Sequence, residues 1–249
     1  MYASRQILLF YIYINEVKPI FEPLNYFKMK FFSLISLSLI LLISCKKDNS
    51  KIYSNFYIRY DDTDENVKAE AVFFVGDTID NAKPYVPENG VFFDEGAMEQ
   101  KDLVNRIVFK SERSTDVKPY FEFKYKNKNK TYDKFELPLP YISSFHINNN
   151  SISLDSGFVV KWEGKPLAKN ENMVIFITDS KNLDKNILFE GPTENSSINV
   201  LSNKLIGLSI GDGSIYLVRK SNNNEIIENL RRSSQAEFYS KASDIHISN

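Results

Sequence analysis

The sequence 52-IYSNFYIRYDDTDENVKAEAVFFVG-76 alternates apolar and polar residues on both sides of an acidic segment. In the first half the residues at 52, 56, 58 and 60 are apolar or aromatic, and in the second half the residues at 67, 69, 71, 73 and 75 are apolar. A period of two is the signature of a strand with one buried face. The segment 61–66, which joins the two halves, is typical of a solvated turn. The stretch therefore predicts two strands and indicates an all-β body.

The rest of the body shows the same pattern in shorter pieces. Only two places are candidates for a helix: 97–104, for a single turn, and 224–232, where Ile226, Ile227 and Leu230 have helical spacing. The sequence Gly-Asp-Gly at 211–213 predicts a tight hairpin, because such turns need positive φ angles. The Lys/Asn segment 126–130 predicts a hairpin tip. Further strands are expected at 91–93, 106–110, 121–126, 132–139, 158–163, 173–178, 187–189, 197–201, 205–210, 214–219, 237–239 and 244–247.

Many short strands at a spacing of about 8–12 residues favour a sandwich. The segment Leu137-Pro138-Leu139-Pro140 interrupts the pattern, because proline cannot donate to a sheet ladder. We therefore predict two tandem Ig-like β-sandwich modules, at 51–140 and 141–249. Trp162 is expected to point inward in the second module, as a core tryptophan does in Ig-like domains. The paired cysteines of antibody domains are absent, so this resemblance is architectural.

Composition excludes several classes of protein. The chain has 249 residues, a formal net charge of −1, 43% hydrophobic and 25% charged residues, which is close to a soluble globular average. A wholly disordered chain, a polytopic membrane protein and a collagen-like repeat are excluded. The near-neutral charge argues against a nucleic-acid partner. With one cysteine, no disulfide can form within the chain.

The segment before the body has the features of a secretory signal peptide. Lys28 and Lys30 precede a mostly apolar run at 31–43, and this run is shorter than the roughly 20 residues that a spanning helix needs. We predict a signal peptide at 29–44 and a start at Met29. The preceding segment 1–28 is interpreted as a mis-assigned upstream start.

The run ends in Leu42-Ile43-Ser44-Cys45, which resembles the lipobox of bacterial lipoproteins. The resemblance implies cleavage after Ser44, diacylglycerol on the sulfur of Cys45, and N-acylation with a chain such as palmitate. Two or three acyl chains hold a protein stably on a membrane, whereas one does so only marginally. The alternatives are an inert buried thiol and an uncleaved signal anchor.

The junction Ser-Cys-Lys-Lys-Asp and the Lys/Asn/Ile/Phe/Tyr-rich body resemble lipoproteins of Bacteroidota-type bacteria. This resemblance implies a short tether at 45–50 and an outer-membrane location, on the periplasmic face or at the cell surface. Asp77-Thr78-Ile79 resembles the short O-glycosylation site of the same group, which makes Thr78 a candidate glycosylation site.

The sequence contains no recognised motif for catalysis, metal binding or cofactor binding. The only histidines, His146 and His246, lie in apolar segments and are expected to face solvent from strands. No zinc motif is present, and 61–66 lacks the glycine and distal glutamate of an EF-hand loop. There is no nucleophile elbow, and Gly211 and Gly213 do not begin a dinucleotide fingerprint. We therefore expect no cofactor and no enzymatic activity. The paired carboxylates of a glycan hydrolase leave no sequence signature, because their spacing is spatial rather than sequential.

The remaining candidates are surfaces. The basic and aromatic segment 124–130 is interpreted as a solvated strand face leading into a hairpin. Tyr53 and Tyr57 share a face and either stack on sugars or cover a neighbouring sheet. The leading hypothesis is a lipid-anchored envelope protein with a non-catalytic binding or structural role toward another envelope protein or a glycan. The alternatives are a glycan hydrolase with paired carboxylates and an accessory lipoprotein of a secretion or uptake assembly.

Overall fold

The computed structural model describes residues 50–128 and 130–249. The segments predicted at 1–28 and 29–44, including Ser44, and the predicted lipid site Cys45 lie outside the described residues. Within these ranges the chain forms strands and two short 3-10 turns, which confirms the all-β expectation. The elements are β1 (Lys51–Asp61), β2 (Asn66–Gly76), β3 (Lys83–Pro84), β4 (Val91–Phe93), β5 (Gly96–Ala97), β6 (Glu99–Leu103), β7 (Arg106–Ser114), β8 (Tyr120–Lys126), β9 (Tyr132–Pro138), β10 (Phe145–Ile147), η2 (Asn148–Asn150), β11 (Ser151–Ser153), β12 (Phe158–Trp162), β13 (Glu171–Thr178), β14 (Asp184–Glu190), β15 (Ser197–Val200), η3 (Ser202–Lys204), β16 (Gly211–Ile227), β17 (Leu230–Tyr239) and β18 (Ser243–Ser248).

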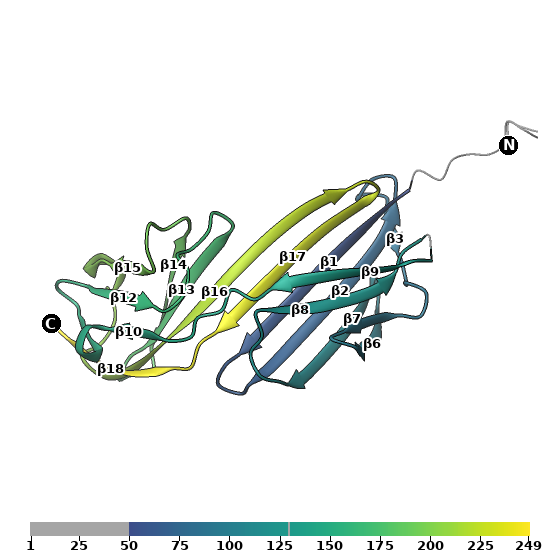
Figure 1. Cartoon of the computed structure of the whole chain (residues 1–249). Coiled ribbons are helices and arrows are strands. Elements are labelled where there is room, and N and C mark those ends of the chain that lie inside the picture. The colour runs from purple at the N-terminus through teal and green to yellow at the C-terminus, as the bar shows by residue number, and fades with distance from the viewer. Residues whose placement is uncertain (1–49, 129) are drawn as a thin grey trace, which may run out of the picture. The chain divides into compact units, whose positions relative to one another are not determined.

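The strands form three sheets, of which the largest has eleven strands in the described part of the chain. Its main path runs β11-β18-β16-β17-β1-β2-β7-β6. The strands β1 and β2 are the two that the first stretch predicted. The strand β1 pairs antiparallel with β2 and in parallel with β17 along its other edge. Figure 1 shows β17 between β16 and β1. The pairing satisfies backbone groups that would otherwise leave β1 as an open edge.

The strand β17 belongs to the segment that we assigned to the second module. Its residues from Leu230 to Tyr239 pair with β1, so strand pairing crosses the boundary expected between 140 and 141. The long β16–β17 hairpin brings the C-terminal segment to the edge of β1. The pairing of β1 with β17 could not be predicted from the sequence. The alternation of residues along a strand shows which face is buried, but it does not show which other strand lies beside it.

The hairpin predicted at 211–213 is wrong, and so is the strand predicted at 205–210. The segment 201–210 is an irregular loop around η3, and β16 begins at Gly211. A Cβ at Gly213 would overlap the carbonyl oxygen of Thr178 at the end of β13. Glycine is therefore needed at position 213 for close backbone approach, rather than for a turn.

Both helical predictions are also wrong. The segment 97–104 contains β5 and β6, and β6 pairs with β7. The segment 224–232 is the β16–β17 hairpin, which turns at 228–229. Hydrogen-bonding to an existing strand outweighs the weak helical spacing in each case.

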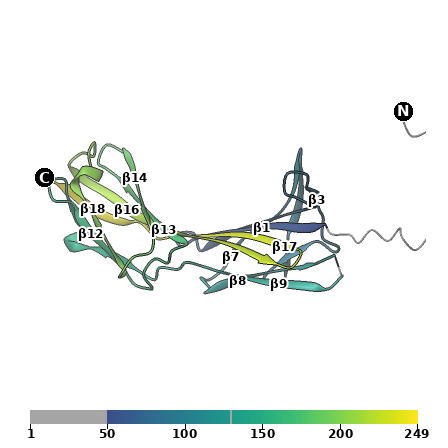
Figure 2. The same cartoon turned by 90° about the horizontal axis from the view of Figure 1, so that it is seen from above.

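Aromatic side chains fill the core between β1–β2 and the sheet of β4, β8 and β9. The Phe56 ring on β1 lies 4.8 Å from Phe123 on β8 and 5.0 Å from Phe135 on β9, centroid to centroid. Figure 2 shows β8 and β9 as a second layer beside the layer of β1 and β17. Two sheets thus pack face to face, which is a sandwich arrangement.

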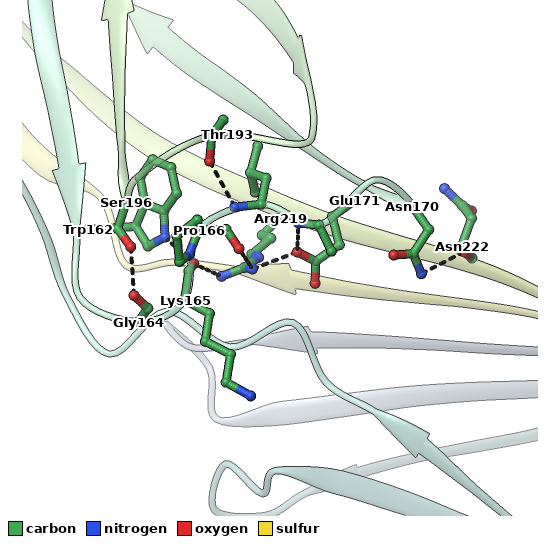
Figure 3. Close-up of polar contacts among 12 residues, drawn as sticks. Trp162, Gly164, Lys165, Pro166, Asn170, Glu171, Thr193, Ser196, Arg219 and Asn222 are labelled. Atoms are coloured by element: carbon green, nitrogen blue, oxygen red, sulfur yellow. Dashed lines mark hydrogen bonds and ion pairs between the residues drawn. The ribbon is translucent and has the colours of Figure 1, made fainter.

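A buried arginine fixes the loop after β12. Arg219 on β16 is 4% exposed; it donates to the carbonyl oxygens of Lys165 and Pro166, both at 3.0 Å, and its Nη2 lies 2.6 Å from Glu171 Oε2. Figure 3 shows the guanidinium between these groups. Trp162 is 4% exposed, as expected for a core tryptophan, and its indole N–H donates to the same Lys165 carbonyl.

Candidate functional site

Two loops next to the start of β16 expose large apolar side chains. These loops are 179–183, between β13 and β14, and 201–210, between β15 and β16. The apolar side chains that they expose are Leu183 (48%), Leu201 (54%), Ile206 (72%) and Ile210 (53%). We call these four side chains the apolar loop platform. Apolar side chains gathered on a surface mark contact sites more often than scattered single ones do.

A single buried carboxylate ties the two loops together. Asp179 is 3% exposed, and its Oδ1 accepts the backbone N–H groups of Lys181 at 2.8 Å and Leu183 at 2.9 Å. Its Oδ2 accepts the N–H of Ser209, in the other loop, at 2.7 Å. The bond from Leu183 contributes most to lowering the pKa of Asp179, and the bonds from Ser209 and Lys181 reinforce it against the opposing effect of desolvation.

Further contacts hold the platform in place. The hydroxyl of Ser180 donates to the carbonyl of Ile210, and the ammonium of Lys185 donates to the carbonyl of Ile206, both at 2.9 Å. Leu205, in the same loop as Ile206, is 1% exposed and anchors the loop in the core. Because the loops are already ordered, a partner would lose little free energy by immobilising them.

A second candidate surface lies on the outer face of β1, β17 and β16. Glu237 is 5% exposed although it points away from the aromatic core. Its Oε2 accepts the hydroxyls of Tyr57 at 3.0 Å and Tyr239 at 3.1 Å. Its Oε1 lies 2.8 Å from both Lys220 Nζ and Gln235 Nε2. We call Tyr57, Arg59, Glu237 and Tyr239 the tyrosine face.

The electrostatics of the tyrosine face follow from this network. Burial would raise the pKa of Glu237, but the hydrogen bond and charge of Lys220, with the hydroxyl of Tyr57, lower it below its usual value. Burial and the adjacent Glu237 charge raise the pKa of Tyr239 to about 12, and the same causes raise the pKa of Tyr57. The Arg59 guanidinium carbon lies 3.9 Å from the centroid of the Tyr239 ring. The face therefore presents aromatic rings around a fixed carboxylate.

A groove of about 390 Å³ lies on the same outer face, nearer the N-terminal end of β1. Tyr53 lines it, together with Phe74 on β2 and Ile226 on β16. The two tyrosines that we expected on one face do share it, but Tyr57 donates to Glu237 while Tyr53 lines the groove and donates to the carbonyl of Asp77.

The other candidates from the sequence belong to neither set of side chains. His146 on β10 and His246 on β18 are exposed strand residues, as expected, and His246 Nδ1 lies 2.8 Å from Asp212 Oδ1. Thr78 is exposed in the β2–β3 turn, where its N–H donates to Asn81 Oδ1 at 3.1 Å. Among the described residues, no group of three or more histidine, cysteine, aspartate or glutamate side chains is arranged to hold a metal ion.

The basic and acidic runs form hairpin turns. The segment 61–66 joins β1 to β2, which confirms the expected turn. The segment 126–130 joins β8 to β9, apart from residue 129, which lies outside the description. On the strands next to it, Lys124 and Lys126 lie over the ring of Tyr132, at 4.7 and 5.7 Å from its centroid.

Comparison with known proteins does not identify a relative. No protein-family model matches the chain, and no curated protein matches its sequence. Within residues 50–128 and 130–249 we find no helix of the length and apolarity that crossing a bilayer requires.

The sequence pattern alone did not identify Asp179 and Glu237 as central carboxylates. Asp179 had a usable signal, because an aspartate followed by Ser-Lys-Asn directly after a strand is typical of an Asx turn. Glu237 had none, since Tyr57 is 180 residues away along the chain.

Proposed function

We propose that the chain is a lipid-anchored outer-membrane protein that binds another envelope protein through the apolar loop platform, without catalysis. The platform is the observation that favours this role, because four exposed apolar side chains are presented by loops that Asp179 holds in place. The anchor is supported by the lipobox at Cys45 and its signal sequence. We further propose that the sheets form two Ig-like modules, with β16 and β17 completing the first. The packing of β1 on β8 and the buried Trp162 support this arrangement.

The placement of the platform suits a tethered binding protein. Ile210 directly precedes β16, and the other end of β16 adjoins the start of β1, where the N–H of Ile52 donates to the carbonyl of Asn229 at 2.9 Å. A strand of this length spans about 55 Å. The length of β16 thus separates the platform from the start of β1, which is joined to the predicted tether 45–50.

The proposal is tested by photo-crosslinking in the native bacterium. A photo-reactive amino acid at Ile206 is expected to capture one envelope protein in a discrete complex, and Ile210→Asp on the same chain should abolish the complex. The matched control places the photo-reactive group at Leu188, which is 55% exposed on β14 and lies outside the platform. Equal capture from both positions, or capture that Ile210→Asp leaves unchanged, would refute the docking role.

The tyrosine face favours a second function, the binding of a glycan. Aromatic rings offer apolar faces to sugars, and Glu237 holds the rings of Tyr57 and Tyr239 in place by accepting their hydroxyls. Calorimetric titration with envelope glycan fragments is expected to show binding that Tyr239→Ala abolishes. In the alternative of a glycan hydrolase with paired carboxylates, the same fragments would be cleaved. A third alternative, an accessory role in a secretion or uptake assembly, would appear in the crosslinking as a subunit of such an assembly.

A further inference from the structure

Several hairpin turns meet at the end of the large sheet where the described chain begins. Gly76 pairs with Lys51, and Leu230 pairs with Ile52, so the β2–β3 and β16–β17 turns lie beside the first residues of β1. The β6–β7 turn lies at the same end, because Val108 pairs with Val72 a few residues before Gly76. We call this region the tether end.

The turns of the tether end expose apolar side chains. Val104 in the β6–β7 turn is fully exposed (100%), and Ile79 in the β2–β3 turn is 57% exposed. Ile227 is the last residue of β16 and is 49% exposed. Three turns that are separate in sequence thus each leave a branched aliphatic side chain in solvent beside the N-terminal end of β1. Exposed apolar groups at the tips of a rigid body are suited to shallow insertion at an interface.

The charges at the tether end are mixed. Exposed Lys83 and Arg106 lie near exposed Asp80 and Asp102 in sequence. The β8–β9 hairpin tip, with exposed Lys128 and Lys130, also lies at this end, because Lys128 contacts Ser50. Attraction of these lysines to anionic lipid therefore adds to the contact that the aliphatic side chains make. This predicts a contact that added salt weakens but does not abolish.

The length of the predicted tether limits the distance between the tether end and the membrane. Ser50 is the fifth residue after Cys45, and five residue steps of an extended chain span at most about 18 Å. An acylated Cys45 would hold the tether end within that distance of the lipid headgroups. The high local concentration makes even a weak insertion effective. We propose that the tether end rests on the bilayer, with Val104, Ile79 and Ile227 inserted among the headgroups; this rests on the lipid anchor proposed above.

The experiment uses the full acylated protein reconstituted in vesicles of phosphatidylethanolamine and phosphatidylglycerol. Cysteine is introduced in separate variants by Val104→Cys, Ile227→Cys and the control Leu188→Cys, and is labelled with an environment-sensitive dye. The chain has one native cysteine, the acylated Cys45, so each variant offers one free thiol. We expect lipids with a nitroxide near the headgroup to quench the dye at 104 and 227 several-fold more than at 188 at low salt, and still more than at 188 at high salt.

A second variant tests the aliphatic contact itself. Ile79→Asp in the Val104→Cys background is expected to lower the contact equilibrium by roughly tenfold or more, since it removes one inserted side chain. Unchanged fluorescence of Trp162, the only tryptophan, shows that the variant is folded. Quenching at 104 that is no greater than at 188 overturns the proposal.

The two proposals fail in distinguishable ways. Mass spectrometry that finds Cys45 without acyl chains refutes the anchor, and the dye would then label two thiols per chain. An acylated Cys45 with unquenched dye at 104 and 227 refutes only the bilayer contact. Protection of both positions in cells but not in pure lipid vesicles would show a protein at the tether end, which also overturns the bilayer contact.

Discussion

Replacing Arg219 by leucine is expected to destabilise the protein strongly. The guanidinium is 4% exposed and contacts the Glu171 carboxylate at 2.6 Å, while the Glu171 side chain is itself only 14% exposed. The variant leaves that carboxylate with one backbone partner, the N–H of Ala168 at 2.8 Å, and removes the donor to the carbonyl of Pro166. Breaking one side of a buried ion pair costs about 3–5 kcal/mol.

This loss is large compared with the total stability of a domain, which is about 5–15 kcal/mol. For a body of this size it corresponds to a fall in melting temperature of roughly 6–20 °C. The assay is thermal unfolding of the purified protein by circular dichroism, with Trp162 fluorescence as a local probe. Trp162 is the only tryptophan, and its indole donates to the Lys165 carbonyl that Arg219 also contacts, so its emission should shift.

Two comparisons sharpen the test. Arg106→Leu removes an exposed arginine and should change stability by no more than about 0.5 kcal/mol. Adding Glu171→Leu to Arg219→Leu should recover part of the loss, because the uncompensated charge is removed. A cost below about 1 kcal/mol for Arg219→Leu, with unchanged Trp162 emission, would refute the reasoning.

Three further predictions concern Glu237, Asp179 and Gly213. The folded-state pKa of Glu237 is lowered, so the carboxylate stabilises the fold fully above its ordinary pKa of 4.5, and this stabilisation is lost as the pH falls below that value. Glu237→Gln should therefore make the stability measured by urea titration depend less on pH in the acid range. The same acid dependence with and without the substitution would contradict the network. Asp179→Ala should release the two loops without unfolding the sheets, and amide hydrogen exchange at Leu183 and Ser209 should become faster. Unchanged exchange there would contradict the role of Asp179 in holding the loops. Gly213→Ala should cost about 1–3 kcal/mol in denaturant unfolding, because its Cβ would overlap the Thr178 carbonyl, and a neutral result would show that the close approach relaxes without strain.

The sequence by itself determined the strands in which apolar and polar residues alternate, because one face of such a strand is buried. The strands β1, β2, β8 and β12 were found this way, because alternation depends only on which face a strand buries. Trp162 was placed in the core for the same reason. The turn at 61–66 was also predictable, since its acidic residues favour a solvated connection.

Only the tertiary structure decided which strands pair and which polar groups meet. The parallel pairing of β17 with β1 joins residues about 180 positions apart, and the two helical predictions failed because β6 and the end of β16 pair with neighbouring strands. The Glu237 network exists only after that pairing, since Tyr57 and Tyr239 come from different ends of the chain. Hydrogen bonds between distant strands depend on register and edge exposure, which a local residue pattern does not encode.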